Sequence, residues 1–199
     1  AIRPLQVAMH SRWPSIARIT TLVREGAIPD PADDVAAHVR LFDDVQSEYV
    51  FCLLLSHGLC EALINSTIAV ALVRIGSPEL FSLCERADFL EKWTNAPKIA
   101  CPAYNLDKSS AVYETLKRLN AQRNYYLHNK AEVSVDGQLV FTGTRAKHKS
   151  IQSDVDWIHR YASLPHDLAE ILIRHEHLRL PAIVLADRDP IPKAPQHKP

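Results

Sequence analysis

The chain has 199 residues, of which 47% are hydrophobic and 23% charged, and only five are glycine. This length suits one domain with a sizeable core, and the low glycine content favours helices. Lys plus Arg equals Asp plus Glu at 23 each, so the formal net charge is zero. A protein that coats nucleic acid or a membrane through a general positive field is therefore excluded, and RNA binding would need a local site.

The N-terminal thirty residues are predicted to hold one short helix. Pro14–Ser15 marks its start and it extends to Arg24, before the loop EGAIPDP. We therefore predict that residues 1–31 form an N-terminal extension with a short helix, outside the main bundle.

A long helix is predicted after that loop. Apolar residues recur at helical spacing from Val35 to Val73 and stop at Gly76 and Pro78. Gly58 is the expected kink or break. Polar residues interrupt the apolar run before it reaches the ~18 to 20 residues of a membrane span, so we expect a core helix and no membrane partner.

The middle of the chain alternates short helices with loops. The segment SPELFSLCERADFLEKW predicts one or two short helices with Ser77 as N-cap, and TNAPKIACPAYNLDKSS predicts a loop. Ser109 or Ser110 then caps a helix with the sequence AVYETLKRLNAQRNYYLHN.

The periodicity then changes from helical to alternating. Residues 132–141 alternate around Asp136–Gly137, which predicts a β-hairpin. A last helix follows over DVDWIHRYASLPHDLAEILIRHEHL, with Pro165 as a kink or break, and residues 181–199 form a proline-rich tail. The expected fold is all-α: an up-and-down helical bundle over residues 32–180, with a small β-hairpin insertion after the third main helix.

Neither the cysteines nor the histidines predict a metal site. No cysteine pair has CxxC spacing, and His175 and His177 point roughly 200° apart on a helix, so they cannot share an ion. We expect buried thiols in a reducing cytoplasm, no metal and no other cofactor. The four cysteines are Cys52, Cys60, Cys84 and Cys101.

The end of the third main helix carries the candidate site. Its apolar seam, Leu116 and Leu119, continues at position 123, which is Arg. A guanidinium on a core-facing seam cannot lose its proton and needs an anionic or multiply accepting partner. Arg123 and His128 lie roughly 140° apart on one helix, so they converge only if the helix ends near His128 or a second copy supplies one of them.

Residues Arg123 to His128, R-N-Y-Y-L-H, resemble the signature of HEPN-domain proteins (higher eukaryotes and prokaryotes nucleotide-binding). In that family an Arg is followed by a polar residue and then, after a short gap, by a His. The resemblance covers roughly residues 32–178 and implies a HEPN-like bundle. It also implies a metal-independent endoribonuclease of the toxin or phage-defence type, whose site forms where two copies meet in a homodimer.

The resemblance makes Arg123, Asn124 and His128 the expected catalytic residues. An imidazole transfers protons near neutral pH, and a guanidinium holds two phosphate oxygens while charge builds on them. Asn124 would orient the phosphate or the imidazole. Attack by the RNA 2′-OH would leave 2′,3′-cyclic phosphate and 5′-OH ends.

Further residues are expected to support this site. Glu61 and Asn65 form a polar row with His57 on the long helix, and Glu61 is the expected partner of Arg123. Tyr126 is a candidate for stacking on a base, although one tyrosine of this pair is expected in the core. Possible contacts to the RNA backbone are Lys130, Arg145, Lys147 and Lys149.

Two other interpretations remain open. In the first, the chain is a catalytically silent HEPN-like module that binds a nucleotide or a protein. In the second it is purely structural, with Arg123 paired to a core carboxylate and His128 capping a helix end. An antitoxin or regulatory partner is compatible with the first interpretation and with the enzyme.

Overall fold

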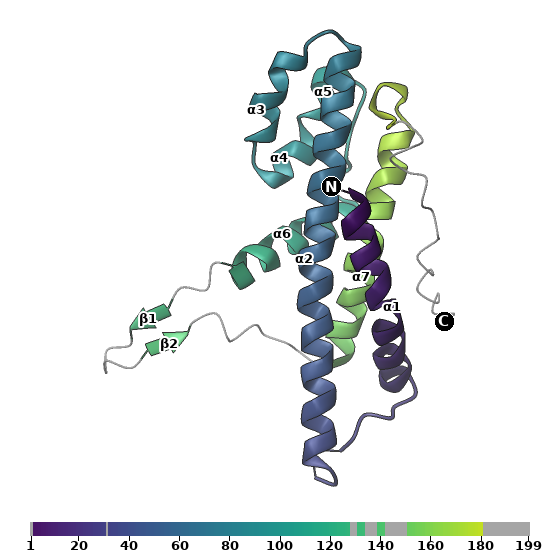
Figure 1. The fold of residues 1–199 in the computed structure, drawn as a ribbon, viewed down its shortest axis with the longest axis vertical. Helices are drawn as coiled ribbons and strands as arrows, with labels where there is room; N and C mark the ends of the chain where they lie inside the picture. The colour runs from purple at the N-terminus through teal and green to yellow at the C-terminus, as the bar shows by residue number, and fades with distance from the viewer. Residues whose placement is uncertain (1, 31, 128–130, 134–138, 142–150, 181–199) are drawn as a thin grey trace.

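The computed structural model describes residues 2–30, 32–127, 131–133, 139–141 and 151–180 (Figure 1). It is mostly helical, which confirms the all-α class. Four longer helices form the body of the molecule. They are α1 (Ile2–Arg24), α2 (Val35–Arg74), α6 (Ala111–Leu127) and α7 (Ile151–Ile173).

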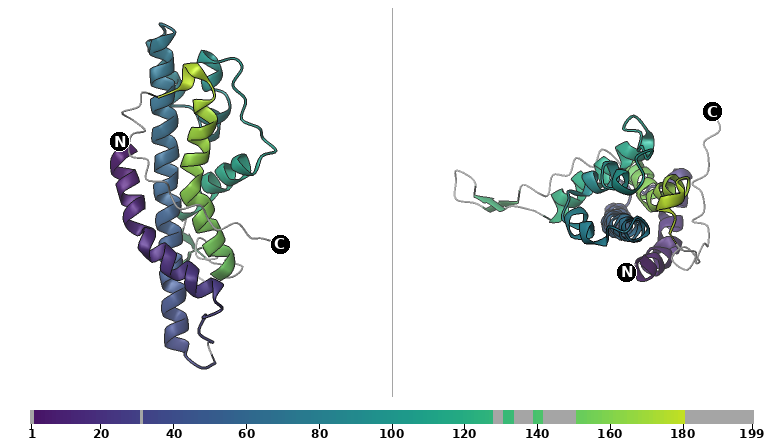
Figure 2. Two further views of the ribbon diagram at one scale, coloured as in Figure 1. Left: turned by 90° about the vertical axis from the view of Figure 1, so that its right-hand side faces the viewer. Right: turned by 90° about the horizontal axis from the view of Figure 1, so that it is seen from above.

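Helix α2 is the axis of the fold, and α1, α6 and α7 pack around it (Figures 1 and 2). Its N-cap is Asp34, whose side chain accepts a hydrogen bond from Ala37 N at 2.9 Å. Gly76, with a φ of 75°, ends it. By length and composition α2 is apolar enough to cross a membrane, and half of its apolar window is buried inside the bundle.

Helix α2 continues through Gly58 as a single helix, so the predicted break there is wrong. A Cβ built on Gly58 would lie 3.4 Å from Leu5 Cδ1 of α1, at the point where the two helices approach. The hydrophobic core on both sides of this point holds α2 in one piece.

Helix α1 is longer than the predicted Ser15–Arg24 helix, since it begins at Ile2 and contains Pro14. Figure 2 shows it running obliquely across α2 towards α7. Ile16 and Ile19 are completely buried, and Met9 is nearly so. The first helix therefore contributes directly to the hydrophobic core of the bundle.

Short helices cover the C-terminal end of α2 (Figure 1). The predicted Ser77–Pro78 start is present, followed by η1 (Pro78–Leu80), α3 (Phe81–Glu85) and α4 (Phe89–Thr94). The segment predicted as a loop contains one more short helix, α5 (Pro97–Ala100).

Helix α7 lies alongside α2 and runs through Pro165, so the predicted break there is also wrong. The fully buried Leu164 and Leu168 flank the proline and keep this turn on the core. A short helix, η3 (Glu176–Leu178), follows and packs on α2.

Two three-residue strands, β1 (Ala131–Val133) and β2 (Leu139–Phe141), pair antiparallel, with Glu132 opposite Val140. The Asp136–Gly137 turn and the tail 181–199 lie outside the described residues. The hairpin insertion as a whole stays a prediction.

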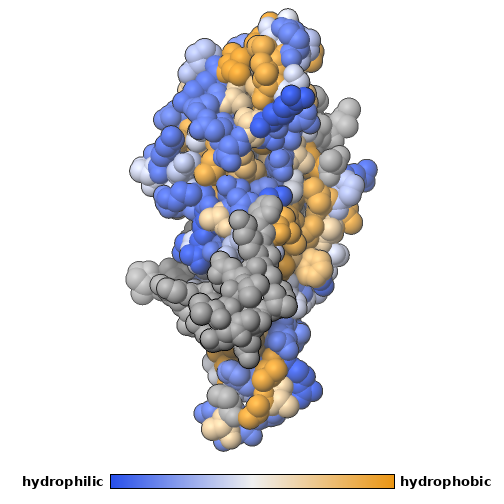
Figure 3. Space-filling model, turned by 90° about the vertical axis from the view of Figure 1, so that its left-hand side faces the viewer, coloured by the Kyte–Doolittle hydropathy of each residue, from blue (hydrophilic) through white to orange (hydrophobic). Residues whose placement is uncertain are grey.

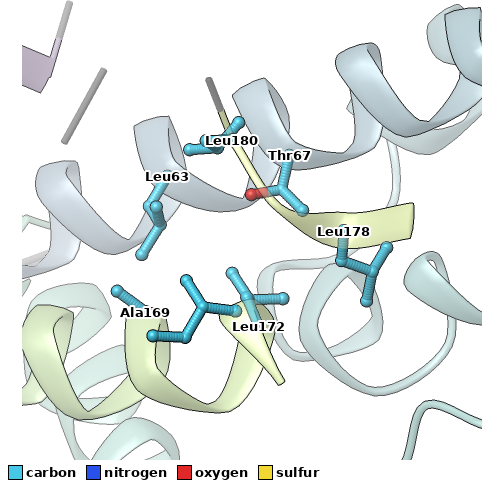
Figure 4. A pocket seen from close by; sticks show the side chains of 7 residues that line it. Leu63, Thr67, Ala169, Leu172, Leu178 and Leu180 are labelled. Carbon is cyan, nitrogen blue, oxygen red and sulfur yellow. The ribbon is translucent and has the colours of Figure 1, made fainter. Parts of the chain in front are cut away.

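A small apolar pocket lies between α2, α7 and the segment around η3 (Figure 4). Its volume is about 10 Å³, which is room for roughly one water molecule. Its lining includes Leu63, Leu172 and Leu178, with the Thr67 side chain as its only polar one. This pocket is too small for a substrate.

Candidate functional site

Helix α6 positions the first two residues of the R-N-Y-Y-L-H motif. Ser110 caps the helix, because its Oγ accepts a hydrogen bond from Tyr113 N at 3.2 Å. Leu116 and Leu119 are fully buried and anchor α6 in the core. One turn further on, Arg123 is half-buried. This agrees with its position on the continuation of the apolar seam.

Arg123 and Asn124 contact each other directly. Arg123 Nη1 donates a hydrogen bond to Asn124 Oδ1 at 3.0 Å, and the Asn124 side chain is exposed. Among the described residues, no carboxylate forms an ion pair with Arg123. The guanidinium therefore retains donors for an outside acceptor.

The expected Glu61–Arg123 pair is replaced by another pair. Glu61 Oε1 accepts from Lys92 Nζ of α4 at 3.0 Å. Lys92 is only 3% exposed, so its ammonium needs a carboxylate nearby. The prediction that Glu61 holds Arg123 is wrong, because the short helix α4 brings this lysine to the position expected for the arginine.

His57 lies between the Glu61–Lys92 pair and Arg123. It is 6% exposed, and its ring stacks on Phe89 with a centroid distance of 4.1 Å. Its Nδ1 lies 4.0 Å from a Glu61 carboxylate oxygen, while its buried Nε2 has no hydrogen-bond partner among the described residues. His57 is therefore buried within the bundle.

Burial lowers the pKa of His57, and the neighbouring Arg123 charge lowers it further. Glu61 and the nearby Asn120 side chain act in the opposite direction, and Lys92 adds to the lowering. A ring with a lowered pKa is neutral at pH 7. The cluster thus combines the cations of Arg123 and Lys92 with the neutral imidazole of His57. The three residues come from α6, α4 and α2.

Two other predicted supporting residues lie partly inside the bundle. Asn65 is half-buried, and its Oδ1 has no hydrogen-bond partner. Tyr126 is half-buried, with its ring 6.2 Å from that of Tyr49 and 5.5 Å from that of Tyr125. Burial raises the pKa of Tyr126. Of the pair Tyr125–Tyr126, Tyr126 packs against the hydrophobic core.

The remaining predicted site residues lie outside the described part of the chain. Helix α6 is described to Leu127, and His128 is the next residue. The possible backbone contacts are outside as well; they are Lys130, Arg145, Lys147 and Lys149.

Sequence reasoning missed Lys92 and underestimated His57. Nothing in the local pattern around Lys92 distinguishes it from a solvated helix residue. A signal for His57 was present, because it occupies the apolar second half of α2 at helical spacing from Leu53 and Ile64. Within the described residues, no group of three or more His, Cys, Asp or Glu side chains is arranged to hold a metal ion.

No family model, no curated protein and no solved structure matches this chain. The site is therefore interpreted from its residues. A half-buried guanidinium with free donors, next to an amide and a neutral imidazole, is suited to hold an anion such as a phosphodiester.

Proposed function

We propose that this chain is a HEPN-like, metal-independent endoribonuclease that acts in the cytoplasm as a toxin or phage-defence effector. The sequence R-N-Y-Y-L-H at the end of α6 motivates the proposal. The observation that carries it is Arg123, which is half-buried and has no carboxylate partner among the described residues. A structural arginine in that position would be expected to have one.

The proposed chemistry uses the RNA's own nucleophile. Arg123 holds two non-bridging phosphate oxygens and stabilises the charge that develops on them. Asn124, bonded to that guanidinium, fixes its orientation. His128 takes the proton of the 2′-OH or donates one to the 5′-oxygen.

The proposed enzyme is a homodimer, and exposed apolar residues support this. The N-terminal turns of α2 carry Val35, Val39 and Phe42, which are 63%, 49% and 39% exposed. Figure 3 shows apolar surface at that lower end of the molecule. Leu127, 51% exposed, is the leucine of the motif and ends the described part of α6. A second copy would cover these residues, and an antitoxin or regulatory protein is a further proposed partner.

The dimer is tested by light scattering after size-exclusion chromatography. Val39→Asp places a charge in the apolar contact and is expected to shift the mass from two chains to one. Leu83→Asp, at a residue 68% exposed on α3, is the matched control and should leave the mass unchanged. A wild-type protein that runs as a single chain at high concentration contradicts the proposed dimer.

Cleavage is tested with total RNA and tRNA in the presence of EDTA, followed by end-group analysis. The wild type is expected to produce 2′,3′-cyclic phosphate and 5′-OH ends. His128→Ala should lose about 10²- to 10⁴-fold in rate, and Arg123→Gln about 10²- to 10³-fold. Circular dichroism checks that both variants remain folded.

Two outcomes count against the enzyme. Cleavage that persists undiminished in His128→Ala assigns the activity to another site or to a contaminant. Intact RNA with the wild type, combined with RNA binding that depends on Arg123, identifies the chain as the silent binding module instead.

A further inference from the structure

A second reactive cluster lies away from the candidate site, where α5 meets η3. Cys101 follows the last residue of α5, and His175 directly precedes η3. The Cys101 Sγ lies 3.7 Å from His175 Nδ1, although the two residues are 74 positions apart. The Tyr104 ring meets the imidazole edge-on, with a centroid distance of 5.4 Å. The ring is therefore held with Nδ1 towards the sulfur.

This pair lies just beneath the surface. Cys101 is 7% exposed, and the residues around it, Pro102, Ala103, Arg174 and Glu176, are exposed. Both partners belong to the ends of very short helices and their flanking turns. Short elements with exposed neighbours open locally at a low free-energy cost, which gives a small reagent access to the sulfur.

The other three cysteines lie in different surroundings. Burial raises the pKa of Cys60, and burial together with Glu48 raises the pKa of Cys52 to about 12. Burial also raises the pKa of Cys84, which is 5% exposed on the short helix α3. Among the described residues, no histidine lies within hydrogen-bonding distance of the Cys84 sulfur. Cys84 thus resembles Cys101 in exposure but lacks a base.

We propose that Cys101 is a nucleophilic thiol activated by His175, and that it is the site at which this protein is modified by small disulfides. The thiolate is the form of cysteine that attacks, and an adjacent imidazole that accepts the thiol proton is a general way of producing it. The proposal does not depend on the ribonuclease function, because no residue of the candidate site takes part.

The exchange is balanced without any additional oxidant. The Cys101 proton passes to His175 Nδ1, and the sulfur attacks one sulfur of the small disulfide. An S–S bond forms to Cys101 while the original S–S bond breaks. The leaving thiolate then takes the proton from the His175 imidazolium. The product is a mixed disulfide on Cys101 plus one free small thiol.

The experiment measures the modification rate of each cysteine in the full, folded chain. The protein is incubated with 2-hydroxyethyl disulfide, quenched in acid, digested and analysed by mass spectrometry over time. Cys101 is expected to react at least about tenfold faster than Cys84, because an unassisted thiol is only a few per cent thiolate at neutral pH. Rates in urea, where all four thiols are free, provide the intrinsic reference.

His175→Asn keeps a polar side chain near the sulfur but removes the base. It is expected to slow Cys101 about tenfold and to leave Cys84 unchanged. His166→Asn, at an exposed histidine of α7, is the matched control and should change neither rate. If the substitution merely loosened the contact between α5 and η3, Cys101 would react faster. A slower reaction therefore indicates lost proton transfer and not lost structure.

The proposal is overturned if wild-type Cys101 reacts no faster than Cys84. It is equally overturned if Cys101 in folded His175→Asn reacts as fast as in the wild type. The comparison between the two cysteines in the wild type stands even if His175→Asn fails to fold.

Discussion

At the scale of single residues, the main feature of the site is a buried histidine, His57, next to the positive charge of Arg123. His57 is buried, its Nε2 has no hydrogen-bond partner in the described part of the chain, and Arg123 lies near enough to affect its protonation. A protonated His57 would add a second positive charge beside the guanidinium in poorly hydrated surroundings. The neutral ring adds no further positive charge beside Arg123.

The protonation of His57 is directly measurable by NMR. We expect its ring signals, assigned from their loss in His57→Asn, to titrate below the ordinary value of 6.5. Arg123→Gln should raise this pKa, since the charge that lowers it most after burial is removed. A His57 that titrates at 6.5 or above, and does so equally in Arg123→Gln, would show that the two side chains do not interact.

The same shift makes a prediction about stability. Because the folded state resists protonation of His57, the unfolded chain binds more protons as the pH falls below 6.5. The free energy of unfolding should therefore decrease with falling pH in that range, and less steeply in His57→Asn. Urea unfolding over a pH series measures both slopes. Equal slopes in the two proteins would contradict the lowered pKa.

The Glu61–Lys92 pair is the second residue-scale feature. Glu61→Gln leaves the buried ammonium unpaired and is expected to lose about 1–2 kcal/mol, less than for a fully buried pair because the Glu61 side chain is 41% exposed. Lys92→Met should be near neutral. Urea unfolding of the double variant checks the coupling, since Glu61→Gln should cost almost nothing once Lys92 is methionine. If Glu61→Gln destabilises the Lys92→Met protein as much as the wild type, the Glu61–Lys92 pair is not the cause of the loss.

At the scale of elements, helical periodicity predicted α2 well and the start of α1 less well. The long apolar repeat and the Gly76 stop were sufficient to place α2. Local pattern makes Pro14 a helix start, although the buried Met9 continues the helix on its N-terminal side. Propensity predicts a kink or break at Gly58 and Pro165 because it is local, whereas the packing that keeps both helices continuous is tertiary.

Gly58 gives an element-scale prediction. Gly58→Ala should stabilise the protein by about 0.5–1 kcal/mol, because alanine favours the helix and Leu5 Cδ1, at 3.4 Å, leaves room for a methyl group. Thermal or urea unfolding measures the change. Gly76→Ala is the matched control and should destabilise by about 1–2 kcal/mol, since its φ is 75°. A destabilised Gly58→Ala would mean that α1 packs too closely for any side chain.

At the scale of the whole molecule, α1, α2 and α7 share one core. Ile19 of α1 is completely buried, whereas Val7 of the same helix is 61% exposed. Ile19→Ala should lower the free energy of unfolding by about 2–5 kcal/mol, and Val7→Ala by less than about 0.5 kcal/mol. Similar losses for both variants would contradict the packing of α1 into the bundle.

The sequence also limited what could be predicted of the site. The position of Arg123 follows from one apolar seam on one helix, so periodicity was sufficient to single it out. The partners of Glu61 and His57 come from α4 and α6, which are distant in sequence. Such contacts depend on how helices pack, and no spacing rule within one segment contains that information.

The central claim is that Arg123, which pairs with no carboxylate in the described part of the chain, binds an RNA phosphate. Fluorescence anisotropy with a 2′-O-methyl RNA oligonucleotide tests it most directly, because this RNA lacks the nucleophile and cannot be cleaved. We predict that Arg123→Gln weakens binding by about tenfold or more, while Arg40→Gln, at an exposed residue of α2, does not. Equal affinity of wild type and Arg123→Gln would contradict the account.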